Sequence, residues 1–305
     1  MSRNLELSTN QKTYLHEGLK NGIRLSNRDF LKFRDIDIYL STDEFGYVEV
    51  SIGNTKISVR VSSQIIKPYE DRPFEGILTI NSEISSMSSL KFDTNSRSQE
   101  EVLISRIIEK AIRRSNSLDL ENLCIVAGEK VWEIIVDLNF WNFDGNLIDI
   151  GCFASMLALS HFKKPDISIL NDEIKIYDIN EREPVNLSIL HIPICLTFSF
   201  FNLNSKEMNI KGDEANEICL LDCDLIEETY RDGFLVITLN KNRELIQLSK
   251  NGGLPIDAQQ LLELCMKGQS IVDELTNLIK TKIKENEEER YKSNNLGLLE
   301  ATADR

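Results

Sequence analysis

The stretch AGEKVWEIIVDLNFWNFDGNLIDIGCFASMLALSHFKKPD, residues 127–166, changes its hydrophobic period halfway along. In its first part apolar residues fall on every second position, the set being Trp132, Ile134, Val136, Leu138 and Phe140. This period predicts a long strand over residues 130–143 with one buried face. Asp144-Gly145-Asn146 ends the strand, and a helix rich in small residues is predicted from Asp149 to Phe162, closed by Pro165.

Shorter alternating segments precede this unit. Their apolar sets are Ile36, Ile38 and Leu40; Val48, Val50 and Ile52; and Ile57, Val59 and Val61. Gly53-Asn54, between the second and third sets, tolerates a positive φ, which predicts a β-hairpin. Leu78 to Ile84 predicts a fourth strand. The long strand is therefore expected to belong to a sheet.

The segment from Ser98 to Arg114 has helical period. Its apolar positions, spaced by three and four, are Val102, Leu103, Ile107, Ile108, Ala111 and Ile112. The opposite face is partly basic, because Arg106, Lys110 and Arg113 project within one sector. These charges indicate either a solvated helix face, the simpler interpretation, or a surface that binds RNA.

Strands resume after an acidic, turn-rich segment, residues 171–186, which is a candidate hinge between lobes. Alternation over residues 192–200 and a hairpin over residues 234–248 come next, followed beyond Gly252-Gly253 by a helical pattern that reaches Ile283. The order predicts an α+β fold with two similar lobes, residues 1–185 and 186–285. Residues 286–305 are expected to form a charged, flexible tail.

Composition excludes several classes of protein. With 305 residues, 41% hydrophobic and 28% charged, the chain has the composition of a globular protein long enough for two domains. No apolar stretch is long enough to span a bilayer, and the first thirty residues lack the apolar region of a secretory signal, so the cysteines are expected to be reduced.

Net charge also bears on function. The formal charge of −14 argues against an autonomous nucleic-acid binder. The charge is unevenly distributed, however: residues 166–231 hold 5 Lys and Arg against 14 Asp and Glu, whereas residues 85–116 hold 6 against 4. One region is therefore able to face a polyanion while another repels it.

Motifs for catalysis or metal binding are weak. The histidines His16, His161 and His191 stand apart from any nucleophile motif, and Cys219 with Cys223 lacks the spacing of a zinc knuckle. The acidic run from Asp222 to Glu228 fits either a divalent-cation site or a solvated turn, and the turn is the favoured interpretation.

Motifs in order along residues 10–285 resemble the RNase PH family. They are Gly22-Ile23-Arg24, Phe33-Arg34-Asp35-Ile36, Arg72-Pro73-Phe74-Glu75-Gly76, residues 127–137, Asp144-Gly145-Asn146-Leu147-Ile148-Asp149, and the acidic run with Gly252-Gly253. The resemblance implies the RNase PH fold, two βαβα-type lobes similar to ribosomal protein S-five, with mixed sheets and packed helices. The sequence from Asp144 to Asp149 resembles that of one branch of the family, whose members lie in the exosome ring paired with a catalytic partner.

The resemblance also implies that the active site is lost. Active members hold phosphate in a Gly-Thr/Ser-Arg-Thr turn, whereas this turn is Gly145-Asn146-Leu147-Ile148, without arginine or hydroxyl. A second family arginine aligns with Glu100, and of two family aspartates only Asp222 matches, the other being Glu228. We therefore expect no catalytic residue, no metal site and no cofactor, while Asp222 alone leaves open some residual metal binding.

The implied function is that of a non-catalytic scaffold subunit of the eukaryotic RNA exosome core ring. Such a subunit threads single-stranded RNA toward a nuclease supplied by another subunit. A pair of arginines in the archaeal partner chain matches Arg106 and Lys110, which gives these residues an RNA-binding role with Arg97 and Arg113 as neighbours.

The implied partners are other RNase PH-like ring subunits, OB-fold and KH cap subunits, associated 3' to 5' nucleases and single-stranded RNA, with no membrane. The implied location is the nucleus, nucleolus and cytoplasm. Two alternatives remain: an active phosphate-dependent 3' to 5' exoribonuclease, and an unrelated α+β binding domain.

Overall fold

A computed structural model describes residues 8–89, 91–92, 98–170, 173–178, 181–202 and 217–303 of the chain. Helix α1 (Thr9–Lys20) comes first, followed by the strands β1 (Ile36–Leu40), β2 (Tyr47–Ile52), β3 (Thr55–Ile66) and β4 (Ile77–Ile84). Helix α2 (Gln99–Arg113), the 3-10 turn η1 (Glu121–Leu123), β5 (Cys124–Val126), β6 (Lys130–Asn142) and α3 (Leu147–His161) complete the first half.

The second half contains shorter strands and a long helix. Its elements are β7 (Lys163–Lys164), β8 (Ile167–Leu170), β9 (Glu173–Ile176), β10 (Val185–Asn186), β11 (Ile194–Asn202), β12 (Glu217–Leu221), α4 (Leu225–Tyr230), β13 (Gly233–Leu239), β14 (Leu245–Gly252) and α5 (Ala258–Ala303). Among the described residues, no helix has the length and apolar character needed to cross a membrane.

The first sheet is mixed. Its strand order is β1-β2-β3-β6-β4, with β5 also paired to β6; β4 runs parallel to β6, and the other pairs are antiparallel. Gly53, at φ +57, lies in the two-residue turn between β2 and β3, which confirms the predicted hairpin. The alternating face of β6 is buried throughout, from Trp132 to Phe140.

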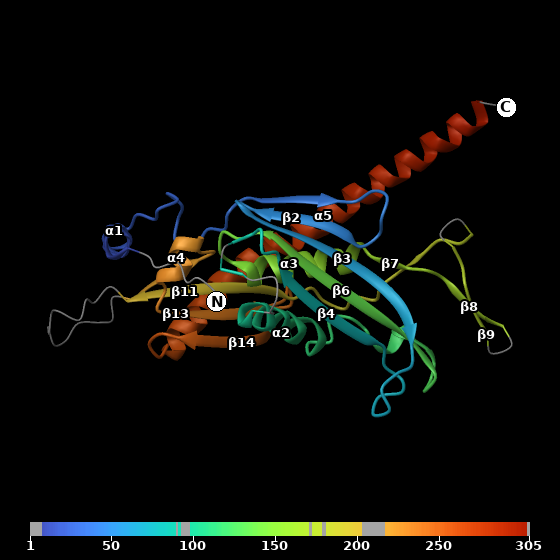
Figure 1. Cartoon of the computed structure of the whole chain (residues 1–305), viewed down its shortest axis with the longest axis horizontal. Coiled ribbons are helices and arrows are strands. Elements are labelled where there is room, and N and C mark those ends of the chain that lie inside the picture. The colour runs from blue at the N-terminus through green and yellow to red at the C-terminus, as the bar shows by residue number, and fades with distance from the viewer. Residues whose placement is uncertain are drawn as a thin grey trace.

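The second sheet is antiparallel, in the order β12-β11-β13-β14. Helix α3 lies between the two sheets, because it packs against β2 and β3 on one side and β11 on the other (Figure 1). Every residue of α3 except Ser160 is buried. A single hydrophobic core extends from the first sheet through α3 to the second sheet and α5, so the two lobes share their interior.

The structure differs from expectation at two segments. Part of the candidate hinge forms a β8–β9 hairpin, with Ile169 paired to Ile174, which Figure 1 shows standing out from the body beside β7. Residues 286–303, expected as a flexible tail, instead continue α5 as helix to Ala303. This segment holds four Glu, which favour helix, and Asn286 and Arg290 attach it to the β1–β2 turn.

Candidate functional site

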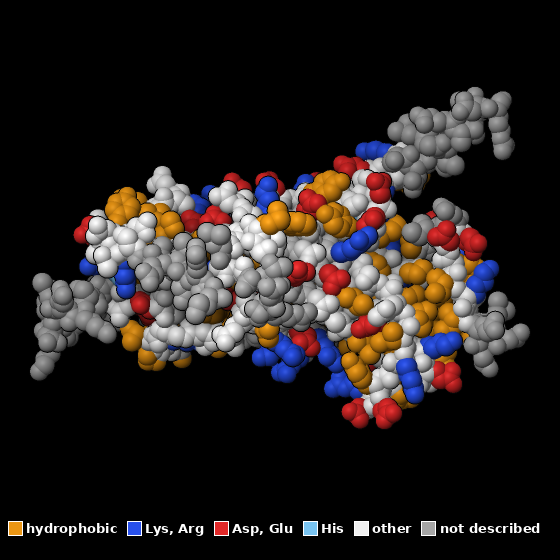
Figure 2. Space-filling model, viewed as in Figure 1, with side chains coloured by type: hydrophobic (Ala, Val, Ile, Leu, Met, Phe, Trp, Pro, Cys, Tyr) orange, Lys and Arg blue, Asp and Glu red, His pale blue; other side chains and the backbone are white. Residues whose placement is uncertain are grey.

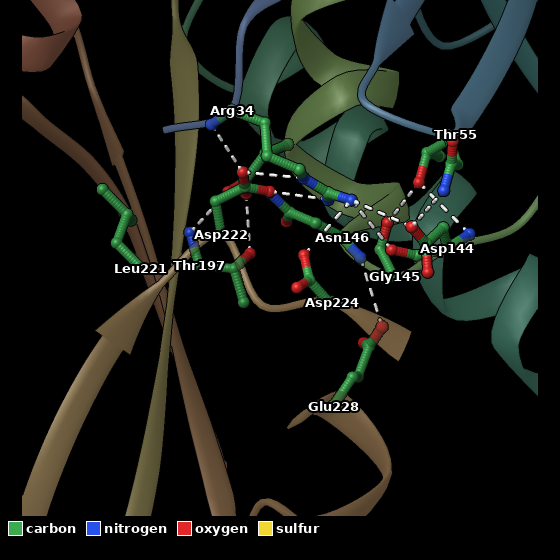
Figure 3. Close-up of polar contacts among 12 residues, drawn as sticks. Arg34, Thr55, Asp144, Gly145, Asn146, Thr197, Leu221, Asp222, Asp224 and Glu228 are labelled. Carbon is green, nitrogen blue, oxygen red and sulfur yellow. Dashed lines mark hydrogen bonds and ion pairs between the residues drawn. The ribbon is translucent and has the colours of Figure 1, made fainter. Parts of the chain in front are cut away.

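The turn between β6 and α3 lies where the two lobes meet. Gly145 and Asn146 have positive φ, +82 and +59. A Cβ on Gly145 would lie 2.5 Å from the backbone oxygen of Cys223, so only glycine allows the turn to lie this close to the second lobe. The Thr55 hydroxyl donates to the Gly145 carbonyl at 2.9 Å and accepts from the Asp144 amide at 3.2 Å (Figure 3).

Asp222 is fully buried beside this turn. Arg34 donates to it from Nε at 2.9 Å, from Nη2 at 2.8 Å and from the backbone amide at 2.9 Å. Asn146 Nδ2 donates to Asp222 Oδ1 at 2.7 Å, and Arg28 Nη1 donates to Oδ2 at 3.0 Å. Burial would raise the pKa of Asp222, but Arg34 outweighs this and holds the pKa below its ordinary value.

A second buried ion pair lies next to the first. Arg24 and Glu227 have no exposed side-chain surface, and their Nη2 and Oε2 atoms are 2.7 Å apart. Burial would lower the pKa of Arg24, and the Glu227 carboxylate reverses the direction and raises it. Arg28 also pairs with Asp224 at 2.8 Å. The interpretation of residues 222–228 as a solvated turn was therefore wrong, because arginines from residues 24–34 neutralise Asp222, Asp224 and Glu227.

Sequence reasoning identified these arginines only as family matches and gave them no role. They lie about 190 to 200 positions from their partners in sequence, as for Arg24 and Glu227 with a separation of 203. Periodicity carries no information about such contacts. The available signal was Asp222 itself, an acid directly after the apolar end of β12, since a buried carboxylate requires a partner.

The backbone amide of Asn146, the residue directly before α3, faces another carboxylate. The Asn146 amide donates to Glu228 Oε2 at 3.2 Å, and Figure 3 shows Glu228 reaching from α4 toward the turn. Glu228 also pairs with Arg231 at 2.8 Å. An anion bound at this amide would therefore compete with a carboxylate of the chain itself.

A cleft of about 400 Å³ opens beside this turn. Its apolar lining includes Leu103, Phe143, Leu147, Ile148, Leu225 and Phe234. The two cations among its described lining residues, Lys91 and Arg231, are paired with Glu100 and Glu228 of the same lining. A phosphate in this cleft would meet two carboxylates and cations that already have partners.

Asp149, in the first turn of α3, ties this helix to the second lobe. Its Oδ2 accepts from the Thr197 amide at 2.9 Å and its Oδ1 accepts from the Thr197 hydroxyl at 2.6 Å. Burial raises the pKa of Asp149 to about 7, although the bonds from Thr197 act in the opposite direction.

Among the residues that the structure describes, no group of three or more His, Cys, Asp or Glu side chains is placed to hold a metal ion. Cys219 lies in β12, Cys195 lies in β11, and Cys223 follows β12. Both oxygens of Asp222 accept hydrogen bonds from the chain itself.

Helix α2 presents the predicted basic residues. Ser98 and Glu101 form a capping box at its start, and Glu101 also accepts from the Ile84 amide of β4 at 2.9 Å, which fixes how the helix lies on the sheet. Figure 2 shows Lys and Arg side chains gathered at the lower edge of the view, over α2.

The predicted RNA-binding residues are partly brought together. Arg106, Lys110 and Arg113 line one hollow with Arg72, Glu109, Arg114 and Asn116. Arg97 lies outside the described residues. The first turns of α2, with Glu100, Leu103 and Ile104, line the cleft described above. One helix therefore borders both the cleft and the basic hollow, and the assignment of RNA to this hollow stays a prediction.

Comparison with known proteins gives consistent results. Residues 32–165 match the model of the 3' exoribonuclease family, domain 1, and residues 191–271 match domain 2 of the same family. The chain is 50% identical to the exosome complex component RRP45 of Saccharomyces cerevisiae, over 96% of each chain. It is 43% identical to the exosome complex component rrp45 of Schizosaccharomyces pombe, over 88% of this chain and 87% of that one.

Solved structures agree in fold. A chain of the Archaeoglobus fulgidus exosome with RNA bound to the active site superimposes with a TM-score of 0.73 at 26% identity, covering 88% of this chain and 96% of that chain. The rice Rrp46 crystal structure, at 13% identity and a TM-score of 0.57, shares the fold.

Proposed function

The chain belongs to the RNase PH family of 3' exoribonucleases, and from this premise we propose that it is a non-catalytic scaffold subunit of an exosome core ring. In this role it holds its place among other RNase PH-like chains and guides single-stranded RNA toward a nuclease carried by another subunit. OB-fold and KH cap subunits and associated 3' to 5' nucleases complete the proposed assembly.

This proposal rests on the Glu228 carboxylate, which accepts a hydrogen bond from the turn before α3. Phosphorolysis requires a phosphate ion held at the reacting centre by cations and backbone amides. Here the Asn146 amide donates to Glu228, Arg34 is bound by Asp222, and Lys91 is paired with Glu100. An incoming phosphate would have to displace carboxylates from each of these donors while meeting their negative charge.

The basic part of α2 supports the guiding role. Arg106 and Lys110 are one helical turn apart and exposed, whereas Asp222 and Glu227 at the lobe junction are buried and neutralised. Contacts from such side chains to RNA phosphates are independent of base sequence. A subunit that passes many RNAs needs this kind of contact.

The test is composition and product analysis on one sample. The chain is purified with its natural partners, the native mass and subunits of the assembly are determined, and any hydrolytic nuclease in it is inactivated. Labelled RNA is then incubated with and without inorganic phosphate, next to an active RNase PH enzyme as positive control.

We expect a large assembly with other RNase PH-like chains and no phosphate-dependent release of nucleoside diphosphates. A free chain or homo-oligomer that releases nucleoside diphosphates only when phosphate is present would instead establish the active exoribonuclease and overturn the proposal.

A further inference from the structure

The basic hollow is built from two separate parts of the chain. The last turns of α2 and the residue that follows them supply Arg106, Lys110, Arg113 and Arg114, and the loop between β3 and β4 supplies Arg72. The hollow has a volume of about 420 Å³, and Glu109 is its one acidic lining residue among those described. Five cations and a single carboxylate line the hollow, and Arg72 also pairs with Glu75 at 3.1 Å, so the lining is positive on a chain whose net charge is −14.

The four cations at the end of α2 fall into two sets. Arg106 and Arg113 share one partner, since Glu109 lies 3.0 Å from Arg106 Nη1 through Oε2 and 3.3 Å from Arg113 Nη1 through Oε1. Lys110 and Arg114 make no ion pair with any residue that the structure describes. Glu109 therefore neutralises half of the set, with one oxygen for each arginine.

The pairs made by Glu109 exchange readily. The Arg106 side chain is 69% exposed and the Glu109 side chain 29% exposed, so water screens their attraction. Exposed ion pairs of this kind contribute little to stability. A phosphate group offers arginine the same two-oxygen geometry as a carboxylate, and it can therefore take the place of Glu109.

We infer that Glu109 is an internal competitor for RNA phosphate, which limits how tightly this hollow holds RNA. The inference rests on the proposed function, because the occupant is the phosphodiester backbone of RNA that passes over α2. Phosphates first meet Lys110 and Arg114, and Arg106 and Arg113 engage only when a phosphate displaces Glu109. Each of these interactions is therefore weak enough to be released as the strand moves.

The test measures RNA affinity of the assembled complex that contains Glu109→Gln. The substitution keeps the side-chain size and removes the competing charge. With oligouridylate as the probe, we expect binding to be roughly two- to fivefold tighter at low salt, the exchange value of one weak exposed pair. The salt dependence should steepen by about 0.7 for each additional phosphate of the single strand that the hollow neutralises.

Glu285→Gln is the matched control. Glu285 forms an exposed i,i+3 pair with Lys282 at 2.7 Å on α5, so its substitution changes net charge by the same amount at a distant ion pair. Affinity should stay at the wild-type value in this variant. Equal tightening in both variants would mean that general charge, and not competition at the hollow, sets the affinity.

A third complex distinguishes competition by Glu109 for its two arginines from a general electrostatic effect of the Glu109 charge. In the background Arg106→Gln with Arg113→Gln, Glu109 has no arginine to occupy, and Glu109→Gln should then produce no gain. A full gain in that background would overturn the inference. If Glu109→Gln changes nothing while charge reversal of Arg106 and Lys110 weakens RNA binding, the inference fails and the proposed function stands; if neither change has an effect, both fail.

Discussion

At the scale of single residues, buried ion pairs stabilise the junction between the two lobes. Arg24 and Glu227 are both fully buried, and Arg24 also donates to the carbonyls of Leu221 and Asp222. Removing one member of such a pair leaves the other charge buried without compensation, which costs more than the pair contributes. The junction therefore depends on each partner being present.

Arg24→Met should lower the free energy of unfolding by about 3 to 5 kcal/mol, because Glu227 then remains as an uncompensated buried charge. Urea unfolding measures this loss. The double variant Arg24→Met with Glu227→Leu should be more stable than the sum of the two single losses predicts. Strict additivity would contradict the account of a coupled buried pair.

At the scale of elements, α3 is the link between the lobes. Its first turn carries Asp149, whose carboxylate accepts two hydrogen bonds from Thr197 of β11. Burial favours the neutral acid, so the folded chain keeps a proton at Asp149 that the unfolded chain loses near the ordinary pKa of 3.8. The contribution of Asp149 to stability therefore decreases as pH rises.

The pH dependence can be measured against Asp149→Asn, which keeps the shape and cannot ionise. As pH rises from 3.8 through about 7, the wild-type chain should lose stability relative to this variant, by a total on the order of 4 kcal/mol. The difference between the two free energies of unfolding removes the contributions of the other titrating groups. A difference that is constant across this range would contradict the raised pKa.

Elements with a regular hydrophobic period were predictable from the sequence. Strand β6 and helix α2 each bury one continuous apolar face, and the turn at Gly53 carries its own local signal. The continuation of α5 over residues 286–303 was not predicted, since Arg290 stacks 3.9 Å from the Phe45 ring and donates to the Ser41 carbonyl. Composition alone does not reveal such a distant contact.

The candidate site was predictable only in outline. The absence of an arginine from the Gly145-Asn146 turn was visible in the sequence, but the carboxylate that takes the anion position belongs to Glu228, 82 positions away. The competing role of Glu109 likewise depends on side-chain positions that helical spacing permits but does not fix.

At the scale of the whole molecule, α2 connects the cleft at the lobe junction with the basic hollow. Its first turns border the cleft in which Lys91 and Arg231 are neutralised, and its last turns border the basic hollow. One end of the helix therefore faces a cleft whose cations are already paired, while the other end carries exposed cations. We propose that RNA passes over this chain without being cut by it.

The most direct measurement is the length of RNA protected by the assembled complex when Arg106→Glu is combined with Lys110→Glu. The matched control is Lys280→Glu with Lys284→Glu, an exposed pair with the same spacing on α5. We expect shortened protection and slower decay for the α2 variant, with normal assembly and no phosphate-dependent products. Protection and decay equal to those of the control would contradict this proposal.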